Sequence, residues 1–157
     1  MGQKGEQAKA LFEQGYNCAQ SVAGVFAEEM GLPFETVVQL ASPFGGGMGR
    51  MREVCGAVSG MLLALGMLRG YSDPKAPEKK RELYVQVQRL AGEFRAQNGS
   101  IVCHELLGLS KGPSEPTPEA RTAAYYKKRP CGELIRCSAD ILADYLAETA
   151  SDADDTP

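Results

Sequence analysis

The sequence predicts an all-α protein, a compact helical bundle built around a central buried helix at about residues 53–69. Apolar residues recur three and four positions apart along most of the chain, which is the spacing of one helix face. The longest apolar run, residues 54–68, contains three glycines and is shorter than the ~20 residues that a membrane-spanning helix needs. No segment shows the alternation of a half-buried strand, so we expect helices alone.

Length and composition narrow the class of protein. A chain of 157 residues suffices for one domain with its own core, which we place at residues 1–150. The net charge of -3 leaves no basic surface for nucleic acid, so we expect no such partner. Residues 1–6 are polar and lack the apolar core of a signal peptide. We therefore expect a cytoplasmic, reducing location, no membrane span, and a disordered acidic tail at residues 151–157.

The first third of the chain predicts three helices, separated by glycine and proline. They are expected around residues 8–12 with a stop near Gly15, from Asn17 to Gly31, and from Pro33 toward Leu40. Asn17 suits an N-cap, because its side chain can accept a hydrogen bond from a free backbone N–H of the first turn. The segment Phe44–Arg50 has four glycines in five positions, and we expect an irregular loop there because glycine stabilises no regular element.

The central helix is expected to expose nearly bare backbone along one face. Gly56, Gly60 and Ala64 lie four residues apart, so another helix can approach that face closely. After a turn, Pro77 and Glu78 suit a helix start, and an apolar stripe then continues to Asn98–Gly99.

The last third of the chain predicts three more helices. They are expected at residues 103–107 with Gly108 as the stop, from Thr117 as N-cap to about Tyr126, and from Pro130 onward. On the last of these, Cys131 shares the apolar stripe, whereas Cys137 points away from it.

Four of the five cysteines share a position at or near the start of a predicted helix. They are Cys18, Cys55, Cys103 and Cys131. A helix N-terminus carries free backbone donors and partial positive charge, which stabilise a thiolate. A single cysteine is most often a small buried apolar residue, but four in this position indicate one site of cysteine chemistry. We therefore predict that these four converge in space and that Cys137 does not.

The neighbours of these cysteines allow more than one interpretation. The glycine loop can cradle an anion with its N–H groups or let the backbone pass close to Cys55, and we favour close packing because the Lys-Ser/Thr of a P-loop is missing. Arg50 and Arg52 either stabilise a thiolate or an anionic substrate, or they remain solvated or pair with Glu53. His104, the only histidine, is expected to be a surface or hydrogen-bonded residue rather than a base, because adjacent helical residues point in different directions.

The cysteines and their surroundings form a pattern that resembles a known family. In order, Cys18, the segment Gly45–Gly60 with its CGAxxG stretch, Cys103 before Glu105–Gly108, and Cys131 are similar to the C-GCAxxG-C-C family of redox-active proteins, over about residues 15–146. The resemblance implies a small all-helical protein whose redox-active cysteines are these four, with Cys137 outside the pattern. Part of it also resembles a segment of split-Soret cytochromes, although C-x-x-C-H, the haem attachment motif, is missing.

The leading functional prediction is a centre for thiol–disulfide chemistry. One thiolate attacks a disulfide or oxidant, and a neighbouring cysteine resolves the intermediate. We expect Cys55 to attack, because it combines the central helix start, the glycine loop and two arginines, and Cys131 to resolve. At least one of the four thiols should titrate below the free value of about 8.5, although burial opposes this.

Two other classes of function fit the same residues. The four cysteines Cys18, Cys55, Cys103 and Cys131 could hold an iron–sulfur cluster or zinc in a metal-binding or electron-transfer module, although zinc sites usually take ligands in close pairs. Alternatively, the face around Gly56 and Gly60 binds a partner helix without catalysis. The sequence points to no particular redox partner, is compatible with a homo-oligomer, and does not choose between an enzyme and a binding protein.

Overall fold

A computed structural model describes residues 2–150 and confirms the all-helical fold. The elements are α1 (Gln3–Glu13), α2 (Cys18–Gly24), α3 (Ala27–Met30), α4 (Phe34–Ala41), the single-turn 3₁₀-helix η1 (Ser42–Phe44), α5 (Gly45–Met48), α6 (Gly56–Arg69), α7 (Pro77–Asn98), α8 (Cys103–Leu107), α9 (Ala123–Lys128) and α10 (Cys131–Glu148). Within this range the only β pairing is one isolated antiparallel bridge between Val54 and Val102. The expected acidic tail, residues 151–157, lies outside the described residues.

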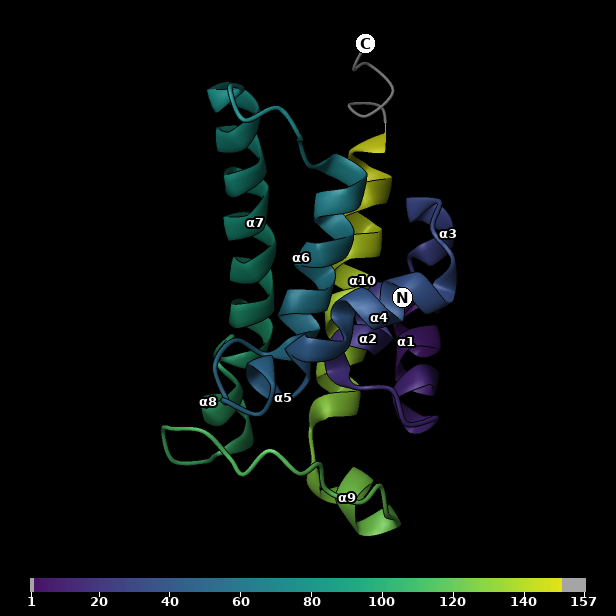
Figure 1. Cartoon of the computed structure of the whole chain (residues 1–157), viewed down its shortest axis with the longest axis vertical. Helices are drawn as coiled ribbons and strands as arrows, with labels where there is room; N and C mark the ends of the chain where they lie inside the picture. The colour runs from purple at the N-terminus through teal and green to yellow at the C-terminus, as the bar shows by residue number, and fades with distance from the viewer. Residues whose placement is uncertain (1, 151–157) are drawn as a thin grey trace.

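The core lies between α6, α10 and the N-terminal helices. Figure 1 shows α6 and α10 side by side along the long axis, with α7 flanking α6. The helix α1 packs along α10 and α2 packs along α6. The centre of α6 is fully buried at Val58, Met61 and Leu65, which confirms the expected central helix. It begins three residues later than predicted, at Gly56, because Val54 is held in the bridge.

The small-residue face of α6 is covered by α2. A Cβ atom added at Gly60 would lie 2.5 Å from the carbonyl oxygen of Ala19, and one at Gly56 would lie 3.0 Å from the Cβ of Cys18. The predicted close approach is therefore confirmed, and it occurs within this chain. The hypothesis that this face binds a separate partner helix is wrong, because α2 already occupies it.

Replacing Gly60 with alanine should test this close approach. The added methyl group meets backbone rather than a flexible side chain, so α2 and α6 must move apart, and we expect a loss of about 2 kcal/mol in the free energy of unfolding. The matched control is Gly66→Ala in the same helix, where no atom lies within 4 Å of the added Cβ. Alanine there should be neutral or stabilise by up to about 1 kcal/mol. Equal effects of the two substitutions in urea unfolding would contradict the close approach.

Two predicted helices have different bounds in the structure. The helix expected from Asn17 to Gly31 is divided into α2 and α3, because Phe26 leaves the helical conformation and its N–H bonds the carbonyl of Ala23 in a tight turn. The helix expected from Thr117 instead begins at Ala123, with Thr122 as the N-cap. The hydroxyl and the backbone N–H of Thr117 both donate to the carboxylate of Glu115, so Thr117 belongs to a local turn and does not cap a helix.

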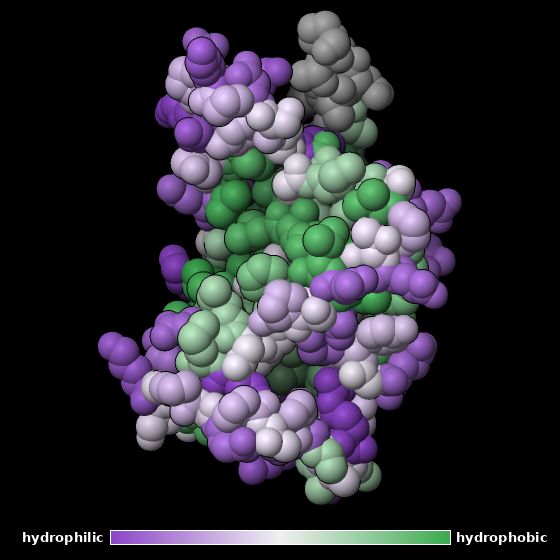
Figure 2. Space-filling model, in the orientation of Figure 1, coloured by the Kyte–Doolittle hydropathy of each residue, from purple (hydrophilic) through white to green (hydrophobic). Residues whose placement is uncertain are grey.

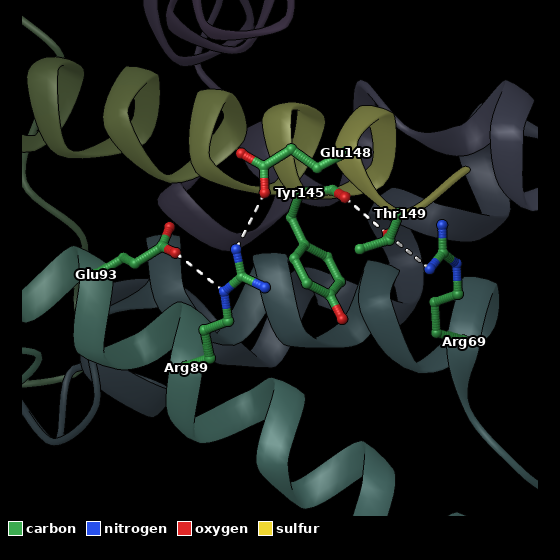
Figure 3. A network of polar contacts seen from close by, with 6 residues as sticks. All are labelled: Arg69, Arg89, Glu93, Tyr145, Glu148 and Thr149. Carbon is green, nitrogen blue, oxygen red and sulfur yellow. Dashed lines mark hydrogen bonds and ion pairs between the residues drawn. The ribbon is translucent and has the colours of Figure 1, made fainter. Parts of the chain in front are cut away.

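The helix α7 is fixed to the bundle mainly through its C-terminal half, where Leu90 and Phe94 are its buried residues. Arg89 adds an ion pair to Glu148 of α10 at 3.0 Å and lies 4.9 Å from the centre of the Tyr145 ring, as Figure 3 shows. Such exposed pairs contribute at most about 1 kcal/mol. Figure 2 shows apolar side chains over α6 and the inner side of α7 on this face. Among the described residues, no helix is long and apolar enough to cross a membrane.

Candidate cysteine site

The four predicted cysteines line one cavity of about 260 Å³. Cys18, Cys55, Cys103 and Cys131 all contribute to its wall, and Cys137 does not. The cavity lies at the end of the bundle where α6 and α10 begin, near α8 and α9 (Figure 1). The predicted convergence of the four cysteines is therefore confirmed in the structure.

Each of the four side chains is placed by the start of a helix. Cys18, Cys103 and Cys131 are the first residues of α2, α8 and α10, and Cys55 is the N-cap of α6. Asn17 caps α2 through a reciprocal capping box with Gln20, as its residue type predicted.

Backbone pairing brings Cys55 and Cys103 to the same wall. The N–H of Cys55 donates to the carbonyl of Ile101 at 2.8 Å, and the N–H of Cys103 donates to the carbonyl of Glu53. These bonds flank the Val54–Val102 bridge. The first turns of α6 and α8, which are far apart in the sequence, are thereby held next to each other.

The glycine segment, residues 45–49, forms part of the cavity wall and turns with left-handed backbone angles. Gly46 and Gly47 have positive φ angles of 69° and 67°, and Met48, Gly49 and Arg50 follow with positive values. This differs from the irregular loop that we expected, because consecutive residues adopt the conformation that glycine tolerates best. Such a turn lets the backbone approach side chains that a Cβ would block.

Close packing beside the cysteines is what the glycines provide. A Cβ atom at Gly47 would lie 2.6 Å from the Cβ of Cys103, and one at Gly56 would lie 3.0 Å from the Cβ of Cys18. For the glycine loop, the favoured interpretation of close packing is therefore supported at Gly47, with Cys103 as the neighbour in place of Cys55.

Arg52 points at a cysteine other than the one expected. Its Nη1 donates to the Sγ of Cys103 at 3.6 Å, and its Nε donates to Ser114 at 2.9 Å. The side chain is buried, with 5% of its surface exposed. Among the described residues, Arg52 forms no ion pair with Glu53, so the pairing considered from the sequence is not the one that the structure contains.

Two further arginines in the cavity wall were missed by the sequence analysis. Arg121 stacks over the Phe12 ring at 4.5 Å and donates to the carbonyl oxygens of Phe12 and Tyr16. Arg129 pairs with Glu119. The sequence held a signal for Arg129 only, namely the basic run of residues 127–129 that ends two residues before Cys131.

The Cys18–Cys131 pair has thiol acidities shifted in opposite directions. Interaction with the Cys18 thiol lowers the pKa of Cys131, and Arg129, Arg121 and Arg52 lower it further against the opposing effect of burial. Interaction with Cys131, together with burial, raises the pKa of Cys18 well above its usual value. The direction of the shift at Cys131 agrees with the expectation that one of the four thiols is more acidic, and a value below about 8.5 stays a prediction. Of the two cysteines, Cys131 is the one that favours the thiolate.

The other two cysteines are poor candidates for ionisation. Burial raises the pKa of Cys55 to about 12, although the backbone N–H groups of Ala57 and Val58 oppose it. Burial also raises the pKa of Cys103, and the hydrogen bond from Arg52 reduces that rise. At Cys55 desolvation outweighs the donors of the helix start, which disfavours this residue as the attacking thiol, and its role stays a prediction.

The remaining residues singled out from the sequence lie away from the cavity. His104 is not part of the cavity wall, and the backbone N–H of His104 donates to the backbone carbonyl of Arg52 at 3.2 Å. Cys137 is half-buried between α10 and the end of α7, where its thiol donates to Gln97 at 3.2 Å and accepts from Asn98 at 3.4 Å. Cys137 lies outside the cavity as predicted, and the role of the His104 side chain stays a prediction.

The four cysteines do not form a metal site in the arrangement that the structure shows. In residues 2–150, no three His, Cys, Asp or Glu side chains are placed so that they could hold one metal ion. As arranged here, the four cysteines do not fit an iron–sulfur cluster or zinc, and we derive no step through either. That hypothesis stays a prediction, which iron, sulfide and zinc analysis of protein purified without oxygen tests.

The fold and the cavity define a helical protein with a four-cysteine pocket. Residues 16–145 match the model of the family described as "Putative redox-active protein (C_GCAxxG_C_C)", and the chain belongs to this family. All five cysteines are free thiols in the structure. No curated protein and no solved structure matched this chain.

Proposed function

We propose that this protein exchanges disulfides through Cys131 as the attacking thiolate and Cys18 as the resolving thiol. The observation that carries the proposal is that Cys18 and Cys131 line the same cavity and that their pKa values are shifted in opposite directions, which favours a thiolate on Cys131 and keeps the proton on Cys18. A thiolate is the nucleophile in disulfide exchange, and a resolving cysteine must lie within reach of it.

The exchange proceeds in two balanced steps. The Cys131 thiolate attacks one sulfur of a substrate disulfide, a mixed disulfide forms, and the first substrate thiolate leaves and takes up a proton. Cys18 then loses its proton and attacks the sulfur of Cys131, a Cys18–Cys131 disulfide forms, and the second substrate thiolate leaves. The substrate disulfide is reduced by two electrons and the cysteine pair is oxidised. A thiol reductant, entering by the same exchange chemistry, restores the pair.

The other two cysteines support the site in their neutral form. Cys55 and Cys103 contribute soft, apolar wall next to the reacting pair, and their raised pKa values keep them protonated near neutral pH. Arg52 donates to Cys103 and also lowers the pKa of Cys131 through its charge. The arginines thus favour negative charge on Cys131, whose pKa is lowered overall, while at Cys103 the effect of burial is larger.

Trapping the intermediate tests this assignment. In Cys18→Ser protein the second step is blocked, so a small disulfide should leave a stable adduct on Cys131 alone. Wild-type protein should instead yield a Cys18–Cys131 disulfide, and Cys131→Ser protein should yield neither. Peptide mass spectrometry after acid quenching reads out each product. An adduct on Cys55 or Cys103 in Cys18→Ser protein would contradict the proposal.

A further inference from the structure

The cavity wall carries far more positive than negative charge. Four guanidinium groups line it, from Arg50, Arg52, Arg121 and Arg129, and the only carboxylate in the wall is that of Glu119. The whole chain has the opposite balance, with a net charge of -3. Cationic side chains are therefore concentrated at the cysteines.

Within residues 2–150, three of the four arginines in the wall form no ion pair with a carboxylate. Glu119 pairs with Arg129. Across the described residues, Arg50, Arg52 and Arg121 pair with no carboxylate. These three are positioned by neutral acceptors instead. The Nε of Arg50 donates to the carbonyl of Glu115 at 2.7 Å, and Arg52 and Arg121 use the partners described above.

One thiolate does not balance this arrangement. A charge held away from water costs free energy unless an opposite charge compensates it, and Arg52 is nearly fully buried. The Cys131 thiolate compensates a single guanidinium. The neutral acceptors orient the other arginines but do not compensate their positive charge. Since Arg is suited to planar, two-pronged recognition of carboxylates, the excess charge is what an anionic ligand would complete.

We propose that the cavity takes a small disulfide that carries carboxylate groups, so that the arginines bind the carboxylates while the disulfide meets Cys131. This inference rests on the proposed exchange function and names its class of substrate. A cavity of about 260 Å³ suits a low-molecular-weight compound and excludes a folded protein domain from its interior. Arg50 lies in the glycine turn and Arg121 packs over the Phe12 ring, so the cationic groups come from segments of the wall that are far apart in the sequence.

Three disulfides of similar size and different charge test the charge preference. Reduced protein is mixed with dithiodipropionate, hydroxyethyl disulfide or cystamine, which are anionic, neutral and cationic. The rate of adduct formation on Cys131 is divided by the rate of the same compound with free mercaptoethanol. We expect the normalised rate to be about tenfold higher for the anion than for the cation, with a gap that narrows as salt is added. Equal normalised rates would overturn the inference and leave the exchange function standing.

Substitution of one arginine locates the preference. Arg129, Arg121 and Arg52 lower the pKa of Cys131, so replacing any of them would also change the reactivity of the thiol. Arg50 is not among them, and Arg50→Gln is therefore the variant chosen. We expect it to reduce the anion-to-cation rate ratio several-fold, after each variant is normalised to its own iodoacetamide rate. The matched control is Arg81→Gln on α7, an exposed arginine outside the cysteine cavity. An unchanged ratio in Arg50→Gln, or an equal drop in Arg81→Gln, would overturn the assignment to this cavity.

A ligand that carries carboxylates but no disulfide tests anion binding separately from disulfide exchange. Thiodipropionate is a thioether with the same two carboxylates and no disulfide. At millimolar concentration it should raise the melting temperature of wild-type protein, and the neutral thioether thiodiethanol should not. A shift without any disulfide reaction would retain the anion site and remove the exchange function. The absence of a shift would overturn the anion site even if exchange occurs.

Discussion

Replacing Cys131 with serine is expected to lower the rate at which the reduced protein reacts with iodoacetamide at pH 7 by about 100-fold. The reagent attacks thiolates, and Cys131 is the one cysteine of the cavity whose pKa is lowered. Cys18, Cys55 and Cys103 all have raised pKa values. A thiol with a pKa of about 12, as at Cys55, is ionised in only about one molecule in 100,000 at pH 7.

Two serine variants serve as controls for this result. Cys55→Ser removes a thiol from the same cavity and should leave the fast reaction in place, because that thiol stays protonated. Cys137→Ser removes a thiol outside the cavity, whose pKa burial also raises, and should have as little effect. Peptide mapping of the alkylated cysteine after a short reaction identifies the reacting residue. If Cys55→Ser abolished the fast reaction and Cys131→Ser did not, the sequence-based choice of nucleophile would be restored.

The position of the cysteines was predictable because it depends on local signals. Helix starts follow from residues that act within one turn, such as Asn17 before Cys18 and Pro130 before Cys131. The apolar stripe of the last helix then directs Cys131 inward and Cys137 outward. Spacing alone was also enough to predict the close approach at Gly60, which needs no knowledge of the partner helix.

The acidity of the cysteines was not predictable, because it depends on residues distant in the sequence. Arg121 lies in the loop that reaches back to Phe12, and no periodicity indicates that it faces Cys131. Arg52 is next to Cys55 in sequence, yet the pairing of residues 52–55 with residues 101–104 directs it to Cys103. A helix start favours a thiolate only where burial is modest, and burial is a property of the whole fold.

In the proposed exchange, the opposite pKa shifts give the two cysteines different roles. The raised pKa of Cys18 keeps it protonated, so it would not compete with Cys131 as a nucleophile in the first step. Once Cys131 is in a mixed disulfide it carries no negative charge, and its contribution to the raised pKa of Cys18 is removed. The order of the two proposed steps then follows from the electrostatics of the two cysteines.

Raising the pH from 7 to 10.5 is expected to destabilise the protein through Cys55 by about 2.7 kcal/mol. Burial raises the pKa of this thiol to about 12 in the folded protein, whereas in the unfolded chain it titrates near 8.5. Between these values the unfolded chain has lost the proton and the folded protein retains it. The folded state therefore binds more protons, and the free energy of unfolding falls by about 1.4 kcal/mol for each pH unit above 8.5.

The pH dependence of Cys55→Ser protein isolates this contribution. A serine hydroxyl does not titrate in this range, so the loss of stability between pH 7 and pH 10.5 should be smaller by about 2.7 kcal/mol than in wild type. Any change in packing is present at both pH values and cancels in the difference. Urea unfolding in the presence of reductant measures it, with Cys137→Ser as the control, because burial raises the pKa of Cys137 less than that of Cys55 and the effect of this variant should be smaller. Equal alkaline losses in wild type and Cys55→Ser would mean that the Cys55 thiol ionises in the folded protein, and Cys55 would again become a candidate for the attacking thiolate.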